Sequence, residues 1–353
     1  MIPKTIPFSP EEYERRLTKT RTAMEAAGID VLCVTDPANM AWLTGYDGWS
    51  FYVHQGVVVF LDRDPFWWGR SQDRNGAIRT VWMEDSRCYG YADHFVQSTE
   101  RHPMQELAAQ MRAMGVATGR VGVEMENYYY TARAHAVLSH ELSDATLVDC
   151  TALVNWCRAV KSEEELVFMR RAARISEKIV DGWLARVEPG VAKNTVVAEI
   201  MRDAVLGVDD AWGDYASIVP LLPSGTDAAA PHLTWDGRPF QQGEATFFEI
   251  AGCYRRYHVP FCRTVFLGDP PDLFLAAENA LVEGLEAGLE VARAGNRACD
   301  IAEALAAPLE LAGITRGARC GYPIGISYPP DWGERTISLR AEDETVLEPN
   351  MTF

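Results

Sequence analysis

The chain has 353 residues, of which 48% are hydrophobic, so it is long enough to bury two hydrophobic cores. Its 50 acidic residues outnumber its 33 lysines and arginines and give a formal net charge of −17. Because so negative a surface repels nucleic acid and anionic membranes, we expect neither as a partner.

Targeting and redox signals are also missing from the sequence. No charged N-terminal segment precedes a long apolar one, and no apolar run approaches the length of a membrane span. We therefore expect a cytoplasmic protein. Its 8 cysteines include no Cys-x-x-Cys pair, which favours reduced thiols over disulfides or structural zinc.

The first third of the chain is predicted to alternate helices and strands. Charged and apolar positions recur at helical spacing over residues 10–28. Short apolar runs bounded by turn residues predict buried strands further on. The expected strands lie at 30–35, 56–61 and 120–124, and further helices at 103–114 and 130–141. This alternation predicts a mostly parallel α/β layer.

A helix start near residue 160 marks the expected domain boundary. Ser162 is a suitable N-cap, and Glu165 completes a capping box at the start of a long amphipathic helix. We therefore expect an α/β domain over residues 1–158 and a second domain over residues 159–353.

The second domain shows a different pattern. Strands are expected at 216–222, 245–251 and 261–267, separated by proline and glycine turns. An alanine-rich stretch from 272 to 313 predicts two helices, broken at 294–296. Helices followed by hairpin strands suggest two α+β halves around a curved antiparallel sheet.

Residues 243–266 resemble the first metal-binding hairpin of the aminopeptidase P, prolidase and creatinase family. In this sequence the family's first aspartate position is Glu249 and its second is Pro260. The family's Gly-His-x-x-Gly ligand motif reads Gly-Tyr-Pro-Ile-Gly at 321–325, which places Tyr322 at the histidine. Since proline has no ligating side chain, we expect no metal and no cofactor.

The resemblance extends over nearly the whole chain. Residues 35–46 resemble the signature of creatinase-type N-terminal domains, and 158–162 resemble the entry to the pita-bread domain. The implied fold is an α/β creatinase-like domain followed by an α+β pita-bread domain. Relatives continue through further strands that carry remaining site glutamates, so we expect the C-terminal end of this sequence to be truncated.

Three long strings, at 46–55, 97–103 and 321–335, are similar to the family's hydrolases that open the cyclic amidine ring of ectoine. This similarity implies a small zwitterionic substrate and N-acetyl-2,4-diaminobutyrate as the product. It also implies a homodimer.

Two residues are the expected catalytic pair. His232 follows a Ser-Gly turn at the position where relatives place a histidine that shuttles protons. Glu249 stands between apolar neighbours at a family ligand position, where burial raises a carboxyl pKa unless a cation holds it ionised. An amidinium substrate would be such a cation. Glu249 could then attack the amidine carbon or activate water, and the sequence leaves both roles open.

Several other residues are expected to contact the substrate. Aromatic faces suit a planar cationic ring, and the family's N-terminal loop reaches the partner subunit's pocket. Cys262 is instead interpreted as a small core thiol. The expected substrate-binding residues are Trp49, Phe51, Tyr52, His258 and Tyr322.

Two rival functions remain. A metal-dependent Xaa-Pro dipeptidase is disfavoured by Pro260 and Tyr322. A pita-bread protein that kept the fold as a binding module and lost catalysis is the rival from another class.

Overall fold

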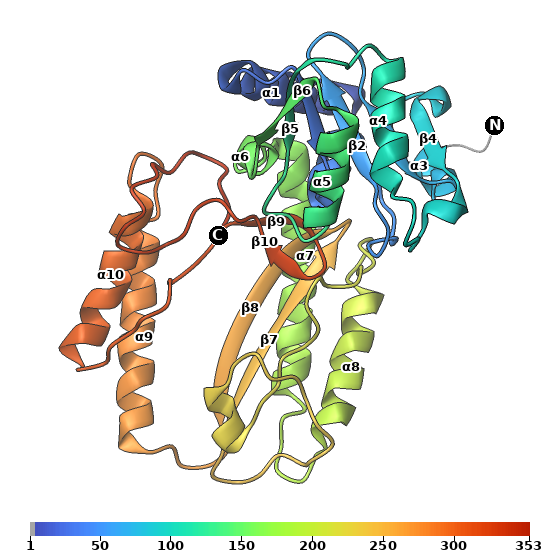
Figure 1. Cartoon of the computed structure of the whole chain (residues 1–353). Coiled ribbons are helices and arrows are strands. Elements are labelled where there is room, and N and C mark those ends of the chain that lie inside the picture. The colour runs from blue at the N-terminus through green and yellow to red at the C-terminus, as the bar shows by residue number, and fades with distance from the viewer. Residues whose placement is uncertain (1–3) are drawn as a thin grey trace. The chain divides into compact units, whose positions relative to one another are not determined.

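The computed structural model describes residues 4–353, and the chain divides into two compact units (Figure 1). The first unit runs to Arg158 and the second from Ala159 to Phe353. Each unit has its own sheet and its own helices, and each is described by itself below.

The first unit is built on a sheet with the strand order β4-β3-β2-β1-β5-β6. Its pairs β1–β5, β5–β6 and β3–β4 are parallel, as the alternation of helices and strands predicts, but β1–β2 and β2–β3 are antiparallel. The strands are β1 (Val31–Val34), β2 (Gly56–Phe60), β3 (Phe66–Arg70), β4 (Cys88–Tyr91), β5 (Gly119–Val123) and β6 (Ala145–Asp149).

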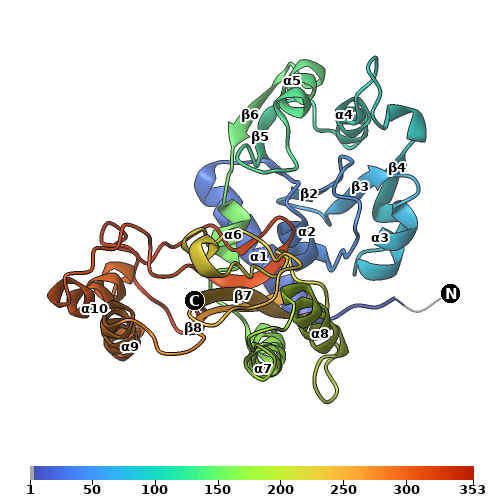
Figure 2. The same cartoon turned by 90° about the horizontal axis from the view of Figure 1, so that it is seen from below.

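Helices cover both faces of this sheet. Figure 2 shows α4 and α5 on one side and α1 and α2 on the other. Met104, Leu107 and Met111 of α4 pack against the strand side chains in one buried cluster. The helices are α1 (Pro10–Ala27), α2 (Pro37–Thr44), α3 (Arg74–Thr80), α4 (Pro103–Ala113), α5 (Ala132–Glu141) and α6 (Leu153–Cys157), with short 3₁₀ turns at Asp85–Arg87 and Asp93–Phe95.

The signature at 35–46 has a structural explanation. Asp36 caps α2 by accepting from the backbone N–H of Ala38 at 2.8 Å. The side-chain amide of Asn39 donates to the buried carboxylate of Glu124 at 2.7 Å and to Asn155 at 2.8 Å. These contacts fix the first turn of α2 against the end of β5, so this part of the motif serves the fold.

The second unit has an antiparallel sheet with the order β10-β9-β8-β7. The long hairpin β7–β8 turns at Arg255 and Arg256, which both have positive φ. Its strands are β7 (Ala245–Tyr254), β8 (Tyr257–Phe266), β9 (Ile324–Tyr328) and β10 (Asp331–Gly333). Its helices are α7 (Glu163–Leu184), α8 (Lys193–Leu206), α9 (Asp272–Val291) and α10 (Ala298–Leu311), with a 3₁₀ turn at Gly225–Ala229.

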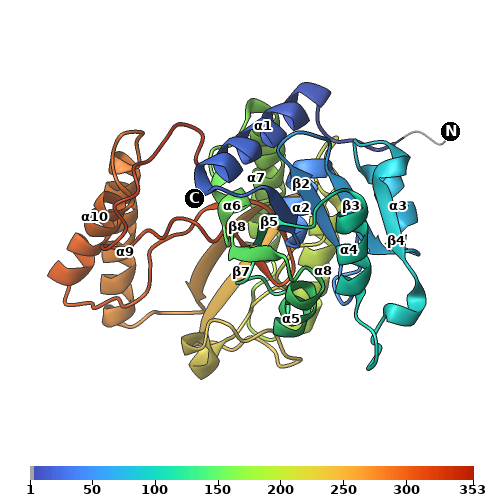
Figure 3. The same ribbon diagram turned by 45° about the horizontal axis from the view of Figure 1, so that its top comes forward.

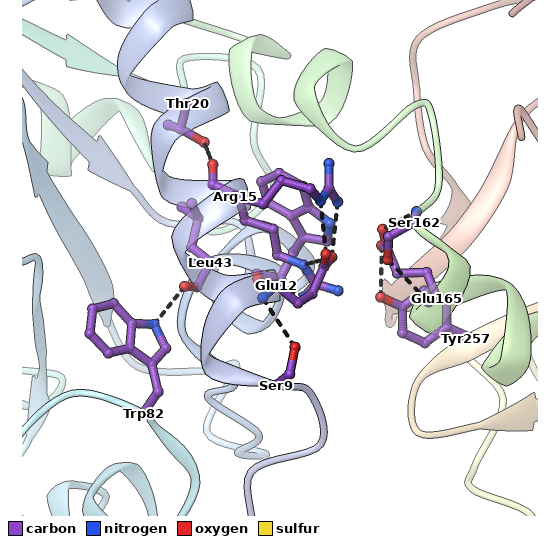
Figure 4. Close-up of polar contacts among 11 residues, drawn as sticks. Ser9, Glu12, Arg15, Thr20, Leu43, Trp82, Ser162, Glu165 and Tyr257 are labelled. Carbon is purple, nitrogen blue, oxygen red and sulfur yellow. Dashed lines mark hydrogen bonds and ion pairs between the residues drawn. The ribbon is translucent and has the colours of Figure 1, made fainter. Parts of the chain in front are cut away.

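Helix α7 packs against one face of the β7–β8 hairpin (Figure 1 and Figure 2). The predicted capping box at its start is confirmed, because Ser162 and Glu165 exchange side-chain and backbone hydrogen bonds (Figure 4). The carboxylate of Glu165 also accepts from the hydroxyl of Tyr257 at 2.9 Å. Farther along, Trp183 stacks on Phe248 with ring centroids 4.6 Å apart. One face of β7 is therefore covered by α7.

The segment predicted as a strand at 216–222 forms no regular strand. Leu221 of this segment and Ser224 just after it instead border the outer edge of β7 through isolated bridges, to Glu249 and Thr246 respectively. Pro220 within the segment and Pro223 directly after it supply no backbone N–H donors, which explains why the pairing stays broken.

The prediction of two helices in the alanine-rich stretch is confirmed. Figure 3 shows α9 and α10 side by side. Their approach is close at Gly284, where an added Cβ would lie 2.5 Å from the carbonyl oxygen of Leu305. A glycine is therefore needed there to let the two backbones meet.

Candidate active site

Glu249 lies on the face of β7 that points away from α7. Phe248 stacks on Trp183 of α7, and side chains alternate along a strand, so Glu249 points to the opposite face. Register pairs Glu249 with Cys262 and Ala251 with Pro260 on β8. Directly paired residues share a face, and so the two family ligand positions, Glu249 and Pro260, face the same side of the hairpin.

The Glu249 carboxylate is half-buried and has no hydrogen-bond partner within residues 4–353. Burial raises its pKa above the ordinary glutamate value, and the charge of His232 acts in the opposite direction. Its oxygens accept no hydrogen bond from any residue between 4 and 353. His232 is exposed, and it lies near enough to Glu249 for its charge to lower the pKa of that carboxyl group. The structure thus brings the expected catalytic pair together in one unit.

Tyr322 belongs to the same neighbourhood. Its hydroxyl oxygen accepts from the indole N–H of Trp332 at 2.8 Å, and the guanidinium of Arg319 lies 4.6 Å from its ring centroid. Burial raises the pKa of Tyr322, and the nearby Glu249 carboxylate raises it further. The hydroxyl proton has no acceptor among residues 4–353, so it remains free to donate to a ligand.

Cys262 differs from the core thiol expected from the sequence. It is exposed, although the strand pairing places it opposite Glu249. Partial burial of the sulfur raises its pKa most, the Glu249 carboxylate adds to this, and Arg263 and Arg316 act against it. Cys262 therefore lines the same face as Glu249 as a protonated thiol.

His258 is completely buried, with both ring nitrogens engaged. Its Nε2 accepts from the backbone N–H of Ser217 at 2.9 Å, and its Nδ1 lies 2.8 Å from the carbonyl oxygen of Arg256. Nδ1 is then the protonated nitrogen of a neutral ring. Burial lowers the pKa of His258 to about 3. This geometry favours a structural role over the substrate contact expected from the sequence.

The expected aromatic residues of the first unit lie on the loop between α2 and β2. Trp49 and Tyr52 are 60% and 63% exposed, which is far more than a packing role requires. Phe51 is half-buried between Trp49 and Tyr129, at centroid distances of 4.7 and 5.9 Å. Phe51 therefore anchors the loop, Trp49 and Tyr52 stay largely exposed, and the guanidinium of Arg70 lies 5.5 Å from the ring centroid of Tyr52.

Two family models together cover almost the whole chain. Residues 167–353 match metallopeptidase family M24, and residues 16–160 match the creatinase/prolidase N-terminal domain. The chain therefore belongs to the creatinase/prolidase family, with a creatinase N-terminal domain and an M24 pita-bread domain, and it is a hydrolase of that family.

Individual relatives agree with this placement. The chain is 55% identical to a protein named ectoine hydrolase from Halomonas elongata, over 100% of this chain and 90% of that protein. It is 40% identical to an uncharacterised hydrolase/peptidase of Sinorhizobium fredii, over 98% and 88% of the two chains. A solved prolidase from Thermococcus sibiricus has a TM-score of 0.80 at 16% identity, covering 96% of this chain and 88% of its own, which supports the fold.

The metal ions of a metallopeptidase do not fit the residues on this face. Pro260 offers no donor atom at the second ligand position, and the Tyr322 hydroxyl is already bonded to Trp332. Within residues 4–353, no group of three or more His, Cys, Asp or Glu side chains is placed to hold a metal ion.

In the same range, no helix is both long and apolar enough to cross a membrane.

Proposed function

We propose that this chain opens the cyclic amidine ring of ectoine by a metal-independent hydrolysis that yields N-acetyl-2,4-diaminobutyrate. The observation that carries the proposal is the isolated Glu249 carboxylate, half-buried beside His232 and unbonded within residues 4–353. The full-length 55% identity to a protein named ectoine hydrolase supports the choice of substrate.

Substrate binding would place a positive charge beside the Glu249 carboxylate. Ectoine carries an amidinium cation, and a cation beside Glu249 lowers the carboxyl pKa that burial has raised. The carboxylate is then ionised in the complex and oriented toward the amidine carbon. Tyr322 donates its free hydroxyl proton to the polar rim of the substrate.

The reaction requires one new C–O bond and one broken C–N bond. Glu249 either attacks the amidine carbon itself, with water releasing the ester later, or takes a proton from the attacking water. In both routes the ring nitrogen leaves with the electrons of the broken bond and must gain a proton. His232 supplies that proton, and the former amidine carbon becomes the acetyl carbonyl.

Proton NMR of ectoine incubated with the purified protein tests this proposal directly. We expect ring opening to continue after exhaustive chelation, and elemental analysis to find no stoichiometric transition metal. Activity that is lost on chelation and restored by manganese or zinc would contradict metal independence. Cleavage of an Xaa-Pro dipeptide would favour the dipeptidase, and ectoine binding without turnover would favour a binding protein.

We further propose that the active site is shared within a homodimer, with Trp49 and Tyr52 closing the partner's pocket. Both side chains are largely exposed, and the Tyr52 ring already has the guanidinium of Arg70 at 5.5 Å from its centroid, which is the kind of contact that a planar cation would make. Mixing inactive Glu249→Gln and Tyr52→Ala proteins should restore part of the activity as subunits exchange, because some mixed sites combine both intact residues. No recovery despite verified exchange would place the site within one chain.

The cytoplasmic location is a proposal as well. Cell fractionation with an antibody against the chain tests it, and recovery of the protein in the membrane or extracellular fraction would contradict it.

A further inference from the structure

The first unit contains a cavity of about 240 Å³ that shares only Tyr52 with the residues given a role above. Segments distant in sequence meet around it: residues 52–54, residues 95–98 with 101–103, and the start of α5 with Arg133. The strings 46–55 and 97–103, which carried part of the family resemblance, both contribute to its wall. The cavity is smaller than the ~300–1,000 Å³ of drug-sized sites, so it suits a metabolite of few atoms.

The charge of this wall is opposite to that of the whole chain. Arg101 and Arg133 line the cavity, and within the described residues no aspartate or glutamate does. Arg133 donates to the carbonyl oxygen of Thr99 at 3.3 Å. The guanidinium of Arg101 has no ion-pair partner between residues 4 and 353. In a protein of net charge −17, two arginines without a facing carboxylate favour an anionic ligand.

A buried histidine adds an uncharged donor to these cations. His102 is only 7% exposed, and its Nδ1 accepts from the backbone N–H of Met104 at 3.2 Å. Burial lowers the pKa of His102 to about 4, so the ring is neutral at pH 7. Its proton must then reside on Nε2, which has no partner among residues 4–353. The His54 ring lies 4.7 Å away and is also held neutral by burial.

We propose that this cavity binds a small carboxylate, with Arg101 and Arg133 as its cationic partners and His102 Nε2 as a neutral donor. Guanidinium groups match the planar, two-oxygen geometry of a carboxylate. Apolar walls from Val53, Phe95 and Pro103 suit a ligand with an organic body better than a bare inorganic anion. Because ectoine and its ring-opened product are both small carboxylates, the choice of natural ligand rests on the proposed function.

The test is a titration of the full chain with ¹⁵N-labelled histidine, carried out on Glu249→Gln protein so that ectoine stays intact. Acetate, ectoine and inorganic phosphate are the probes, and the ring signals of His54 and His102 are followed by NMR. We expect saturable shifts with acetate and ectoine. Arg101→Gln and Arg133→Gln should each weaken binding about tenfold, in line with the loss of one charge-assisted contact. Arg63→Gln, an exposed arginine of the same unit outside the cavity, should leave affinity unchanged.

Several outcomes would overturn the inference. They are an absence of saturable shifts at both rings, unchanged affinity in the folded Arg101→Gln, Arg133→Gln double variant, and tighter binding of phosphate than of acetate. The proposed function fails separately, in the ring-opening assay on wild-type protein. Carboxylate binding without ring opening would therefore contradict the catalytic proposal and leave this site standing.

Discussion

Two glutamates, Glu124 in the first unit and Glu249 in the second, show how carboxyl groups taken out of water can have different roles, although Glu124 is fully buried and Glu249 only half-buried. Glu124 accepts hydrogen bonds from the backbone N–H groups of Thr35 and Asp36 at 2.6 and 2.8 Å, and from Asn39 at 2.7 Å. Glu249 accepts none from any residue between 4 and 353. Burial raises the pKa of both carboxyl groups. What distinguishes them is whether the oxygens already have partners.

The difference separates a structural carboxylate from a reactive one. The lone pairs of Glu124 are used to fix the start of α2, so a ligand would have to compete with the fold for them. Glu249 keeps its lone pairs available on the open face of β7. Carboxyl groups with a shifted pKa occur both in structural networks and in active sites, and the hydrogen bonds around each group distinguish the two cases.

The largest expected effect is on turnover. Glu249→Gln should lower kcat for ring opening by roughly a hundredfold or more, because an amide can neither attack nor accept a proton. Its melting temperature should stay near the wild-type value, since no hydrogen bond within residues 4–353 is lost. Glu124→Gln is the matched control and should keep wild-type turnover per folded molecule. Near-normal kcat in Glu249→Gln would leave that residue a structural role only.

His232→Ala should come next, with kcat lowered by about a hundredfold through loss of the proton carrier. The charge of His232 lowers the pKa of Glu249, so its removal should also move the acidic limb of the kcat/KM profile to higher pH. Leu233→Ala, at the exposed neighbouring position, is the control. An unchanged pH profile with intact kcat would separate His232 from the site.

The sequence predicted the helices and strands whose capping residues or apolar runs are local in the chain and match the burial seen in the structure. The capping box of Ser162 and Glu165 and the apolar runs of β1, β2 and β5 needed only periodicity and turn residues. Strands β3 and β4 were missed, although the aromatic run Phe66–Arg70 is rich in strand-forming residues. The prediction of a strand at 216–222 was wrong, because Pro220 and the following Pro223 interrupt pairing along β7.

Fewer of the contacts in the candidate site could be predicted from the sequence. Glu249 and His232 could be selected only through the family resemblance, since an isolated glutamate in a strand usually faces solvent. The burial of His258 depends on Ser217, which is 41 residues away in sequence, so no local pattern could indicate it. Trp332 and Arg319, which hold Tyr322, were missed for the same reason.

A smaller effect is expected on stability. Glu124→Gln should lower the free energy of unfolding by about 1–3 kcal/mol at pH 6, because an amide nitrogen cannot accept the hydrogen bonds that the carboxyl oxygens now accept. Chemical denaturation followed by circular dichroism measures this loss. Glu126→Gln changes an exposed glutamate near the same strand end and should cost little. A Glu124→Gln protein as stable as wild type would show that the hydrogen bonds around Glu124 are dispensable.

The smallest expected effect is the pH dependence of that stability loss. Burial raises the pKa of Glu124 to about 7, from the value of 4.5 that an exposed glutamate has. Between these two values the folded chain binds a proton that the unfolded chain has released, so the contribution of Glu124 to stability is complete below pH 4.5 and is lost as the pH rises through 7. Glu124→Gln cannot ionise and lacks this dependence. The melting-temperature gap between wild type and variant should therefore narrow by about 2–4 °C from about pH 5 to about pH 8. A gap that widens instead would mean that the surrounding donors keep Glu124 ionised in the folded state and would sharpen its contrast with Glu249.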